Sequence, residues 1–451
     1  MPIIMRNNPR YLAVYILNRV DRNGAYAEPL LNAYLSRNKL TKVHDRKLLT
    51  QVVYGTLRMR NHLDWIIQYF YKGKPASLET GLRNILRTAL FQIIFTDRIP
   101  SFAAVDEAVQ ITKKLYPGRS GLVNGVLRNA IRKMEEVEYP DMEKDFSLYV
   151  SIVHSHPLWL VKRWMKRFGA EETLKLCKSN NETPPLAIRT NTFRTNRDKV
   201  LRELLNDGCK AESSRLSTHG IILTSPLTPV REMPQYKNGH IQVQDEASQL
   251  ISFLVNPDPG EKILDTCAGI GVKTSHMAEL MKNRGEITAL DINKNKSEII
   301  QRLSSRLGIT IIKPQVADAT KDMGENYHGK FDRVLVDAPC SGMGTLRRNP
   351  EIKWRIQEKD LQSFPILQKK ILNRSAGYPK RGGMIIYATC TIEAEENEEV
   401  VKDFLANHPD YERINLPEII NPDLIDNSGF FRTYPHRHGT DGFFGAVFLR
   451  S

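Results

Sequence analysis

Short apolar runs alternate with longer helical stretches from about residue 260 onward, and this alternation restricts the fold more than any other feature of the chain. The apolar runs cover residues 262–267, 286–292, 331–336 and 384–388. Helical periodicity is found near residues 273–281, 294–307 and 361–376. Strands joined by crossover helices form a parallel sheet with helices on both faces, and such a sheet binds ligands at the carboxyl ends of its strands. We therefore expect the functional residues to follow these apolar runs.

Two regions precede this α/β segment. Apolar residues recur at helical spacing within residues 48–57, 63–70, 82–93 and 105–115. This periodicity predicts an all-helical bundle in residues 1–137. Short strand candidates at 186–189 and 220–223 predict a small α+β linker domain in residues 138–240. The α/β domain then occupies residues 241–451, and three domains are consistent with the length of the chain.

The basic charge is concentrated in the first third of the chain. Residues 1–135 contain 22 Lys and Arg against 9 Asp and Glu, whereas the remainder contains 43 against 42. The net charge of +14 therefore comes almost entirely from the helical region. Lys and Arg that neutralise phosphates release counterions, so we expect RNA or another polyanion as a partner. A solvated helical surface that is merely basic is the alternative.

The five cysteines are odd in number and form no C-x-x-C pair, so the sequence predicts free thiols in a reducing compartment and no metal site. No apolar run approaches the ~20 residues of a membrane span. The first residues also lack the apolar core of a signal peptide. We expect a cytoplasmic monomer that has no membrane segment.

Acidic residues stand at or just past four successive predicted strand ends: Asp265, Asp291, Asp318 and Asp337. Gly269 and Gly271 open the helix after the first strand, where free backbone N–H groups can meet a ligand. An acidic residue about 20 positions after such a loop typically holds a ribose hydroxyl. The chain lacks both G-x-x-x-x-G-K-[ST] and the full G-x-G-x-x-G. A nucleoside-type cofactor therefore fits better than ATP or NAD.

Several stretches of the α/β segment resemble the successive motifs of S-adenosylmethionine-dependent RNA cytosine-5 methyltransferases. They read D-T-C-A-G-I-G-V-K-T, L-D-I-N-K-N-K, V-A-D-A-T, V-D-A-P-C-S-G-M-G-T-L-R-R-N-P-E-I-K-W, Y-A-T-C-T-I-E-A-E-E-N-E and D-G-F-F-G-A-V-F-L-R. The helical region, with D-R-K-L-L-T-Q-V-V-Y-G-T-L-R and V-N-G-V-L-R-N, resembles the NusB-like RNA-binding domain. This combination is similar to the Sun/RsmB group, which modifies small-subunit ribosomal RNA in bacteria. It implies a NusB-like bundle, a linker domain and a Rossmann-like methyltransferase domain.

The resemblance also implies the ligands and the residues that bind them. The cofactor is S-adenosyl-L-methionine, and the substrate is a cytosine of small-subunit (16S) ribosomal RNA. The implied cofactor-binding residues are Cys267, Ala268, Gly269, Ile270, Gly271, Val272, Lys273, Asp291, Asp318 and Asp337. Three cations that follow the first catalytic motif are expected to hold the RNA backbone: Arg347, Arg348 and Lys353.

The chemistry of cytosine explains why two cysteines matter. C5 is a poor nucleophile, and a thiolate that adds to C6 makes C5 enamine-like, which is covalent catalysis. By resemblance, Cys390 attacks, Cys340 assists release of the product, and Asp337 hydrogen-bonds the base around N3 and N4. From the residues alone either cysteine is a candidate nucleophile, because DNA cytosine-5 methyltransferases use the thiol of a Pro-Cys pair. Two inert buried thiols are the alternative.

One motif departs from the family pattern. Where the family usually reads C-A-A-P-G-G-K-T, this chain has Ile270 and Val272 in place of Pro and Gly. Gly269 and Gly271 restore the glycine spacing that is common in other methyltransferases. A catalytically impaired factor that binds or assembles ribosomal RNA therefore stays open, as does C5 methylation of another RNA such as tRNA. An amino methyltransferase is disfavoured, because no aromatic residue follows Asp337-Ala338-Pro339.

Overall fold

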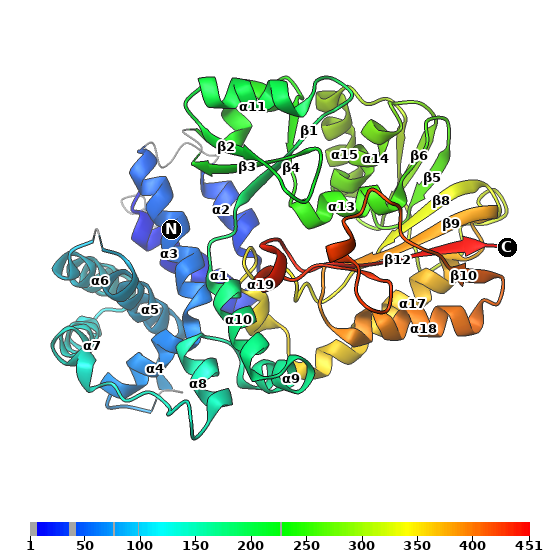
Figure 1. Cartoon of the computed structure of the whole chain (residues 1–451). Helices are drawn as coiled ribbons and strands as arrows, with labels where there is room; N and C mark the ends of the chain where they lie inside the picture. The colour runs from blue at the N-terminus through cyan, green and yellow to red at the C-terminus, as the bar shows by residue number, and fades with distance from the viewer. Residues whose placement is uncertain (1–6, 36–41, 75–76, 98, 226–227) are drawn as a thin grey trace. The chain divides into compact units, whose positions relative to one another are not determined.

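The computed structural model describes residues 7–35, 42–74, 77–97, 99–225 and 228–451. The chain divides into two compact units, whose elements are labelled in Figure 1. Unit 1 comprises Met1–Glu182 and Leu346–Ile356, and unit 2 comprises Thr183–Thr345 and Gln357–Ser451. All five cysteines are free thiols. Among the described residues, no helix has the length and the apolar character that crossing a membrane requires.

Unit 1 is built from helices, as the periodicity predicts. They are α1 (Pro9–Asn23), α2 (Ala27–Leu35), α3 (Val43–Arg58), α4 (Arg60–Phe70), α5 (Thr80–Phe95), α6 (Ser101–Leu115), α7 (Ser120–Lys133), α8 (Phe146–Val153), α9 (Leu158–Phe168), α10 (Ala170–Asn181) and α16 (Ile352–Arg355). Helix α5 supplies Leu82, Ile85, Leu86 and Leu90 to the largest apolar core of this unit. The stripe of apolar residues seen in the sequence is therefore the packing face of α5.

The segment Leu346–Ile356 follows Cys340 in the chain but belongs to unit 1. Its Lys353 is fully buried, and Nζ donates hydrogen bonds to the carbonyl oxygens of Arg58 and Ser155 at 2.8 Å and to Oδ1 of Asn181 at 2.9 Å. Burial lowers the pKa of Lys353 well below its ordinary value. Three protein acceptors thus occupy its ammonium group, and the prediction that Lys353 holds the RNA backbone is wrong.

Unit 2 contains a small antiparallel sheet and a large mixed sheet. The small sheet has the strand order β2-β3-β1-β4. Its elements are β1 (Leu186–Thr190), α11 (Arg197–Asn206), β2 (Lys210–Ser213), β3 (Gly220–Ser225), α12 (Pro234–Lys237) and β4 (Ile241–Val243). Ile188 and Ile221 of the sheet pack against Val200 and Leu204 of α11. The sequence predicts the strands near 186–189 and 220–223, and both are present.

The large sheet has the strand order β10-β12-β9-β8-β5-β6-β7, with β11 paired to β12. Its strands are β5 (Lys262–Asp265), β6 (Glu286–Asp291), β7 (Ile312–Val316), β8 (Phe331–Asp337), β9 (Pro379–Thr389), β10 (Tyr411–Arg413), β11 (Phe431–Arg432) and β12 (Phe444–Arg450). The pairs among β5 to β9 are parallel, as predicted. Strands β10 and β12 add an antiparallel edge that the predicted all-parallel sheet lacks. An antiparallel strand needs no crossover helix, so the alternating pattern does not reveal it.

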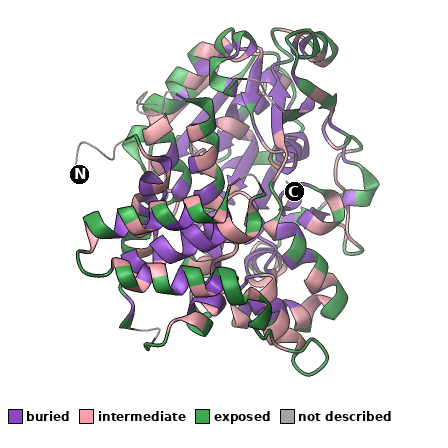
Figure 2. Cartoon of the chain, turned by 90° about the vertical axis from the view of Figure 1, so that its left-hand side faces the viewer, coloured by how far each residue is buried: buried purple, intermediate pink, exposed green. Residues whose placement is uncertain are grey.

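Helices cover both faces of the large sheet (Figure 1). One apolar core contains Ile263, Leu335 and Ile386 and includes residues of α13 (Glu246–Val255), α14 (Val272–Leu280) and α15 (Lys294–Leu307). The other contains the adjacent strand residues, such as Leu264 and Val334, and includes residues of α17 (Ser363–Ser375) and α18 (Glu398–Asn407). Successive strand residues point to opposite faces, which is why the central parts of β5, β8 and β9 carry apolar residues in succession. Figure 2 shows this burial along the strands. The helix α19 (Pro435–His438) precedes β12, which is the last strand in the chain.

Candidate active site at the carboxyl edge of the sheet

The parallel strands end together and carry the predicted site residues to one edge of the large sheet. Asp265 of β5 pairs in register with Leu335 of β8, and Asp337 of β8 pairs with Ala388 of β9. The loops that follow these strands therefore begin at the same edge of the sheet. Cys340 follows β8 and Cys390 follows β9, so neighbouring strands bring the two thiols to the same place.

The two thiols are in direct contact. The Sγ atoms of Cys340 and Cys390 lie 3.2 Å apart, at the distance of a sulfur hydrogen bond in which either atom can be the donor. The hydrogen bond to Cys390 and burial raise the pKa of the Cys340 thiol well above its ordinary value. A pair of touching thiols does not lose both protons together, because two adjacent thiolates repel each other. The arrangement thus places two nucleophile candidates in contact, of which at most one ionises at a time.

Two glycines allow the loops around these thiols to come together. The backbone N–H of Gly344 donates to the carbonyl oxygen of Cys390 at 3.0 Å, and the N–H of Gly442 donates to the carbonyl oxygen of Gly344 at 2.8 Å. A Cβ atom on Gly344 would lie 1.8 Å from the carbonyl oxygen of Gly442, which is impossible without movement of the backbone. The glycines in C-S-G-M-G-T and D-G-F-F-G are therefore needed for close backbone approach.

A lysine from the glycine loop reaches the strand that precedes Cys340. Nζ of Lys273 lies 2.6 Å from Oδ2 of Asp337. Burial opposes the charged form of Lys273, but Asp337 and the nearby Cys390 keep the lysine pKa above its ordinary value. The carboxyl group of Asp265 is fully buried close by, and this burial, with the charge of Asp337, raises the pKa of Asp265 to about 7. Lys273 is thus a cation placed among the carboxylates and thiols of the site.

The loop between β5 and α14 has the backbone conformation that its glycines permit. Gly269 and Gly271 have φ values of 60° and 82°, in the left-handed region that favours glycine. The N–H of Ala268 donates to the carbonyl oxygen of Leu290 at 2.8 Å, which fastens the loop to β6. Ile270 is exposed and Val272 begins α14, so the two departures from the family motif leave the fold of the loop intact.

Asp291 at the end of β6 holds this loop from the other side. Its Oδ2 accepts hydrogen bonds from the N–H of Gly269 at 3.1 Å and from Nζ of Lys296 at 2.9 Å, and Oδ1 accepts from the N–H of Asn293 at 2.8 Å. A carboxylate has about four acceptor positions, so one position remains for a ligand hydroxyl. The donor set and the exposed loop therefore fit a nucleoside with a ribose beside Asp291.

Two other predicted cofactor-binding residues, Asp318 and Cys267, make contacts within the protein. Oδ1 of Asp318 accepts from the backbone and the hydroxyl group of Thr320, and these two hydrogen bonds lower the pKa of Asp318. Asp318 is thus engaged in its own turn, although the N–H of Ala317 links that turn to the carbonyl oxygen of Asp291. Burial raises the pKa of Cys267 to about 12, and its side chain packs against the apolar core that contains Leu264 and Val334.

The sequence interpretation missed two buried side chains that hold the segment around Cys390. Glu396 and Asn397 follow Cys390 closely, and both are fully buried. Oδ1 of Asn397 accepts from the hydroxyl group of Thr389 at 2.6 Å, and Nδ2 donates to the carbonyl oxygen of Thr391 at 3.0 Å. Both residues are part of the motif Y-A-T-C-T-I-E-A-E-E-N-E. The sequence signal for them was an adjacent pair of polar residues shortly after Cys390.

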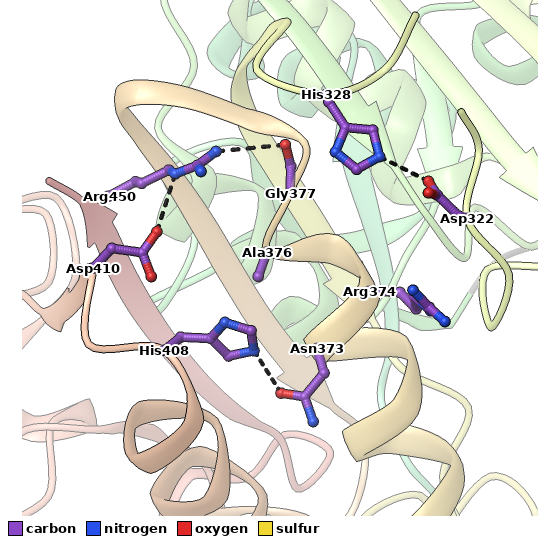
Figure 3. Close-up of a pocket in the computed structure, with 9 residues that line it drawn as sticks. All are labelled: Asp322, His328, Asn373, Arg374, Ala376, Gly377, His408, Asp410 and Arg450. Carbon is purple, nitrogen blue, oxygen red and sulfur yellow. Dashed lines mark hydrogen bonds and ion pairs between the residues drawn. The ribbon is translucent and has the colours of Figure 1, made fainter. Parts of the chain in front are cut away.

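A separate cavity of about 280 Å³ has neither Cys340 nor Cys390 in its lining, and Figure 3 shows the residues that line it. Nine residues line it: Asp322, His328, Asn373, Arg374, Ala376, Gly377, His408, Asp410 and Arg450. Arg450 ends β12, which runs antiparallel to β9, and its neighbour Leu449 pairs with Met384. The cavity is therefore at the amino edge of β9, whereas Cys390 follows the carboxyl edge. Polar side chains of the lining pair with one another: Arg450 forms an ion pair with Asp410, and Nε2 of His328 lies 2.8 Å from Oδ1 of Asp322.

Comparison with known proteins agrees with this architecture. Residues 252–449 match the family described as 16S rRNA methyltransferase RsmB/F, residues 7–132 match the NusB family, and residues 156–231 match the ferredoxin-like domain of RsmF/B-like methyltransferases. The "Probable ribosomal RNA small subunit methyltransferase B" of Bacillus subtilis (strain 168) is 36% identical over 446 residues, which cover 97% of this chain and 98% of the relative.

Two further matches extend over most of the chain. The "Ribosomal RNA small subunit methyltransferase B" of Klebsiella pneumoniae subsp. pneumoniae is 32% identical over 410 residues, covering 90% of this chain and 91% of that protein. A solved structure titled "Crystal Structure of PH0851" aligns with a TM-score of 0.83 at 29% identity and covers 98% of this chain and 99% of that one. The fold and these matches define a methyltransferase. The chain belongs to the 16S rRNA methyltransferase RsmB/F family.

Proposed function

We propose that this protein uses S-adenosyl-L-methionine to methylate C5 of a cytosine in 16S ribosomal RNA through a covalent adduct between Cys390 and C6. The observation that carries the proposal is the 3.2 Å contact between the Sγ atoms of Cys340 and Cys390 at the ligand-binding edge of a Rossmann-like sheet. Addition of a thiolate at C6 turns C5 into a nucleophile, and two adjacent thiols are suited to both the addition and the elimination.

The environment of the pair supports different roles for the two cysteines. The hydrogen bond to Cys390 and burial raise the pKa of the Cys340 thiol, which makes Cys340 the less readily ionised nucleophile candidate of the pair. Cys390 lies close enough to Lys273 to interact with its charge, which places a cation beside the sulfur assigned to the attack. Cys390 is therefore assigned the attack on C6. Cys340 is assigned to assist the later step, in which a base takes the C5 proton and the bond between C6 and the sulfur of Cys390 breaks to release the thiolate.

Asp337 is assigned to the cytosine edge around N3 and N4. Its Oδ2 accepts from Lys273, and in the described part of the chain no hydrogen bond reaches its Oδ1. This oxygen is available to accept a hydrogen bond from the base, while the contact with Lys273 holds the carboxyl group in place. An acceptor at this position stabilises a ring that gains a proton during the addition.

Residues of the glycine loop and of the strand ends are assigned to the cofactor. Gly269 and Gly271 would let the backbone approach it, Asp291 would hold the ribose, and Lys273 would orient it next to the thiols. Cys267, Ala268, Ile270, Val272 and Asp318 complete the proposed set. When bound, S-adenosyl-L-methionine supplies an activated methyl group.

The basic helical region is assigned to RNA binding. Its excess of Lys and Arg fits a phosphate backbone, and its match to the NusB family supports the same role. A target base inside RNA structure must be unstacked before it enters such a site. We also propose that the domain boundaries lie at residues 137 and 240. The protein is proposed to be a monomer that acts in the cytoplasm.

The test is transfer of labelled methyl groups from S-adenosyl-L-methionine to 16S ribosomal RNA, with denaturing gels to detect covalent protein–RNA adducts. We expect the wild type to label C5 of cytosine, Cys390→Ala to lose activity and adduct, and Cys340→Ala to accumulate adduct. An active Cys390→Ala would show that the nucleophile is assigned wrongly. A wild type that binds RNA but neither binds the cofactor nor labels RNA would establish the alternative, an RNA-binding or assembly factor with the altered loop at Ile270 and Val272.

A further inference from the structure

A single buried carboxylate connects the two loops that carry the cysteines. Glu396 lies in the turn η6 (Ala394–Glu396) after β9 and has no exposed surface. Its Oε2 accepts from the N–H of Ser341 at 2.8 Å, and its Oε1 accepts from the hydroxyl groups of Ser341 and, at 3.1 Å, Thr391. Ser341 directly follows Cys340, and Thr391 directly follows Cys390. One side chain therefore holds the residue next to each thiol.

The hydrogen bonds around Glu396 form a closed network. The hydroxyl oxygens of Ser341 and Thr391 lie 2.9 Å apart, and Nε2 of Gln368 donates to Oε2 of Glu396 at 2.9 Å and to the carbonyl oxygen of Pro339 at 3.0 Å. Every partner of the Glu396 carboxyl group is a donor, so the network is built for an acceptor-only carboxylate. Burial raises the pKa of Glu396, and the donors from Ser341, Gln368 and Thr391 oppose that rise.

The backbone around Glu396 is fixed as well. The hydroxyl group of Tyr387 in β9 donates to the carbonyl oxygen of Glu396 at 2.6 Å. Tyr387 is itself completely buried in the sheet. Tyr387 thus fixes the backbone of Glu396 to β9, the strand that ends just before Cys390. The position of the carboxylate relative to the sheet therefore does not depend on exposed loops. Such a rigid support is what a precisely spaced pair of reacting groups requires.

We propose that Glu396 is a positioning residue that sets the distance and orientation of the Cys340 and Cys390 thiols. Glu396 does not contact the thiols and acts through Ser341 and Thr391. The proposal rests on the proposed function, because it assigns a catalytic purpose to the spacing of the two thiols. Without the carboxylate, the loops after β8 and β9 lose their shared acceptor and the thiols separate.

The principal variants are Glu396→Gln and Thr391→Val. Glutamine keeps the size of the side chain but offers one oxygen and one NH₂ group to a set of donors. Valine keeps the shape of Thr391 and removes only its hydroxyl group. Glu399→Gln is the matched control, because Glu399 is an exposed glutamate in the first turn of α18. Thermal unfolding of each variant establishes that the fold is retained.

Two measurements separate positioning from general destabilisation. For methyl transfer, we expect Glu396→Gln to lower kcat by about 100-fold with the KM for RNA changed less than about 2-fold, because misplacement of reacting groups by about 1 Å has an effect of this size. The second measurement is oxidation by diamide, in which each thiol gives up one proton and one electron, an S–S bond forms and the N=N bond becomes a hydrazine. We expect the Cys340–Cys390 disulfide to form about 10-fold more slowly in Glu396→Gln than in the wild type.

The combination of results decides the proposal. Loss of kcat together with slow disulfide formation, in variants that melt like the Glu399→Gln control, supports it. Wild-type rates of disulfide formation in Glu396→Gln overturn it, whatever the activity. If Glu396→Gln does not fold, the same two measurements on Thr391→Val decide, with a smaller change in the same direction. A wild type that transfers no methyl group refutes the proposed function, whereas the disulfide rates still test whether Glu396 sets the spacing.

Discussion

Nζ of Lys273 lies 2.6 Å from Oδ2 of Asp337, so an ion pair joins the first turn of α14, just after the glycine loop, to the strand that leads to Cys340. The two side chains are 15% and 25% exposed, and solvent therefore screens the pair only in part. In the proposed mechanism, this contact couples the cofactor loop to the base-binding carboxylate.

Lys273→Met and Asp337→Ala are each expected to lower kcat/KM by about 100-fold, the loss typical of removing one preorganised polar group from a transition state. The double variant should lose little more than either single one, because both substitutions break the same unit. Steady-state methyl transfer measures this. Lys313→Met is the control, since Lys313 forms an exposed 2.7 Å pair with Glu286 and should retain full activity. Additive losses would show that the two residues act independently.

Asp291→Ala is expected to weaken binding of S-adenosyl-L-methionine by about 10- to 100-fold. Hydrogen bonds to a charged group contribute about 1.5–3 kcal/mol, and the substitution also frees the N–H of Gly269 from its acceptor. Calorimetric titration of the full-length protein measures the Kd. Asp423→Ala, which changes an exposed acid in a surface turn, should bind like the wild type. Unchanged affinity in Asp291→Ala would remove Asp291 from the cofactor site.

Arg189→Met is expected to lower the free energy of unfolding of unit 2 by about 3–5 kcal/mol. Arg189 of β1 and Glu279 of α14 form an ion pair in which both side chains are 0% exposed, and Arg189 also donates to the carbonyl oxygen of Val272. The substitution leaves the Glu279 carboxylate buried without its partner. Denaturant unfolding followed by fluorescence measures the loss. The double variant Arg189→Met/Glu279→Leu should recover much of it, and failure to recover would assign the loss to packing.

Affinity for 16S ribosomal RNA should fall steeply with salt. If six phosphates are neutralised, binding weakens by about 10³-fold between about 50 and 200 mM salt, because the released counterions are then less dilute. Filter binding over this range gives the slope. Cys390→Ala should show the same slope, since it removes no Lys or Arg. A flat response would contradict the assignment of the basic excess in residues 1–135 to phosphate binding.

The main elements of the fold were predictable because local patterns specify them. The apolar runs at 262–267, 286–292 and 331–336 correspond to β5, β6 and β8, and the helical stretch at 294–307 corresponds to α15. The antiparallel edge was not predictable in this way. Strand β12 pairs antiparallel with β9 although α18, β10, β11 and α19 lie between them in the chain, and this pairing depends on long-range contacts that have no local period.

The sequence alone determined which groups stand at the strand ends, because periodicity sets where a strand stops and glycine sets where the backbone can turn. It could not place these groups relative to one another. Cys340 and Cys390 are separated by 50 residues, and only the register between β8 and β9 brings their sulfur atoms to 3.2 Å. The tertiary structure also decided which polar side chains face solvent. Lys353 appears in the sequence as one more basic residue near the site, yet backbone carbonyls and Asn181 enclose its ammonium group. Burial is a property of packing between distant segments, and for that reason the roles of Lys353 and Glu396 became visible only in the folded chain.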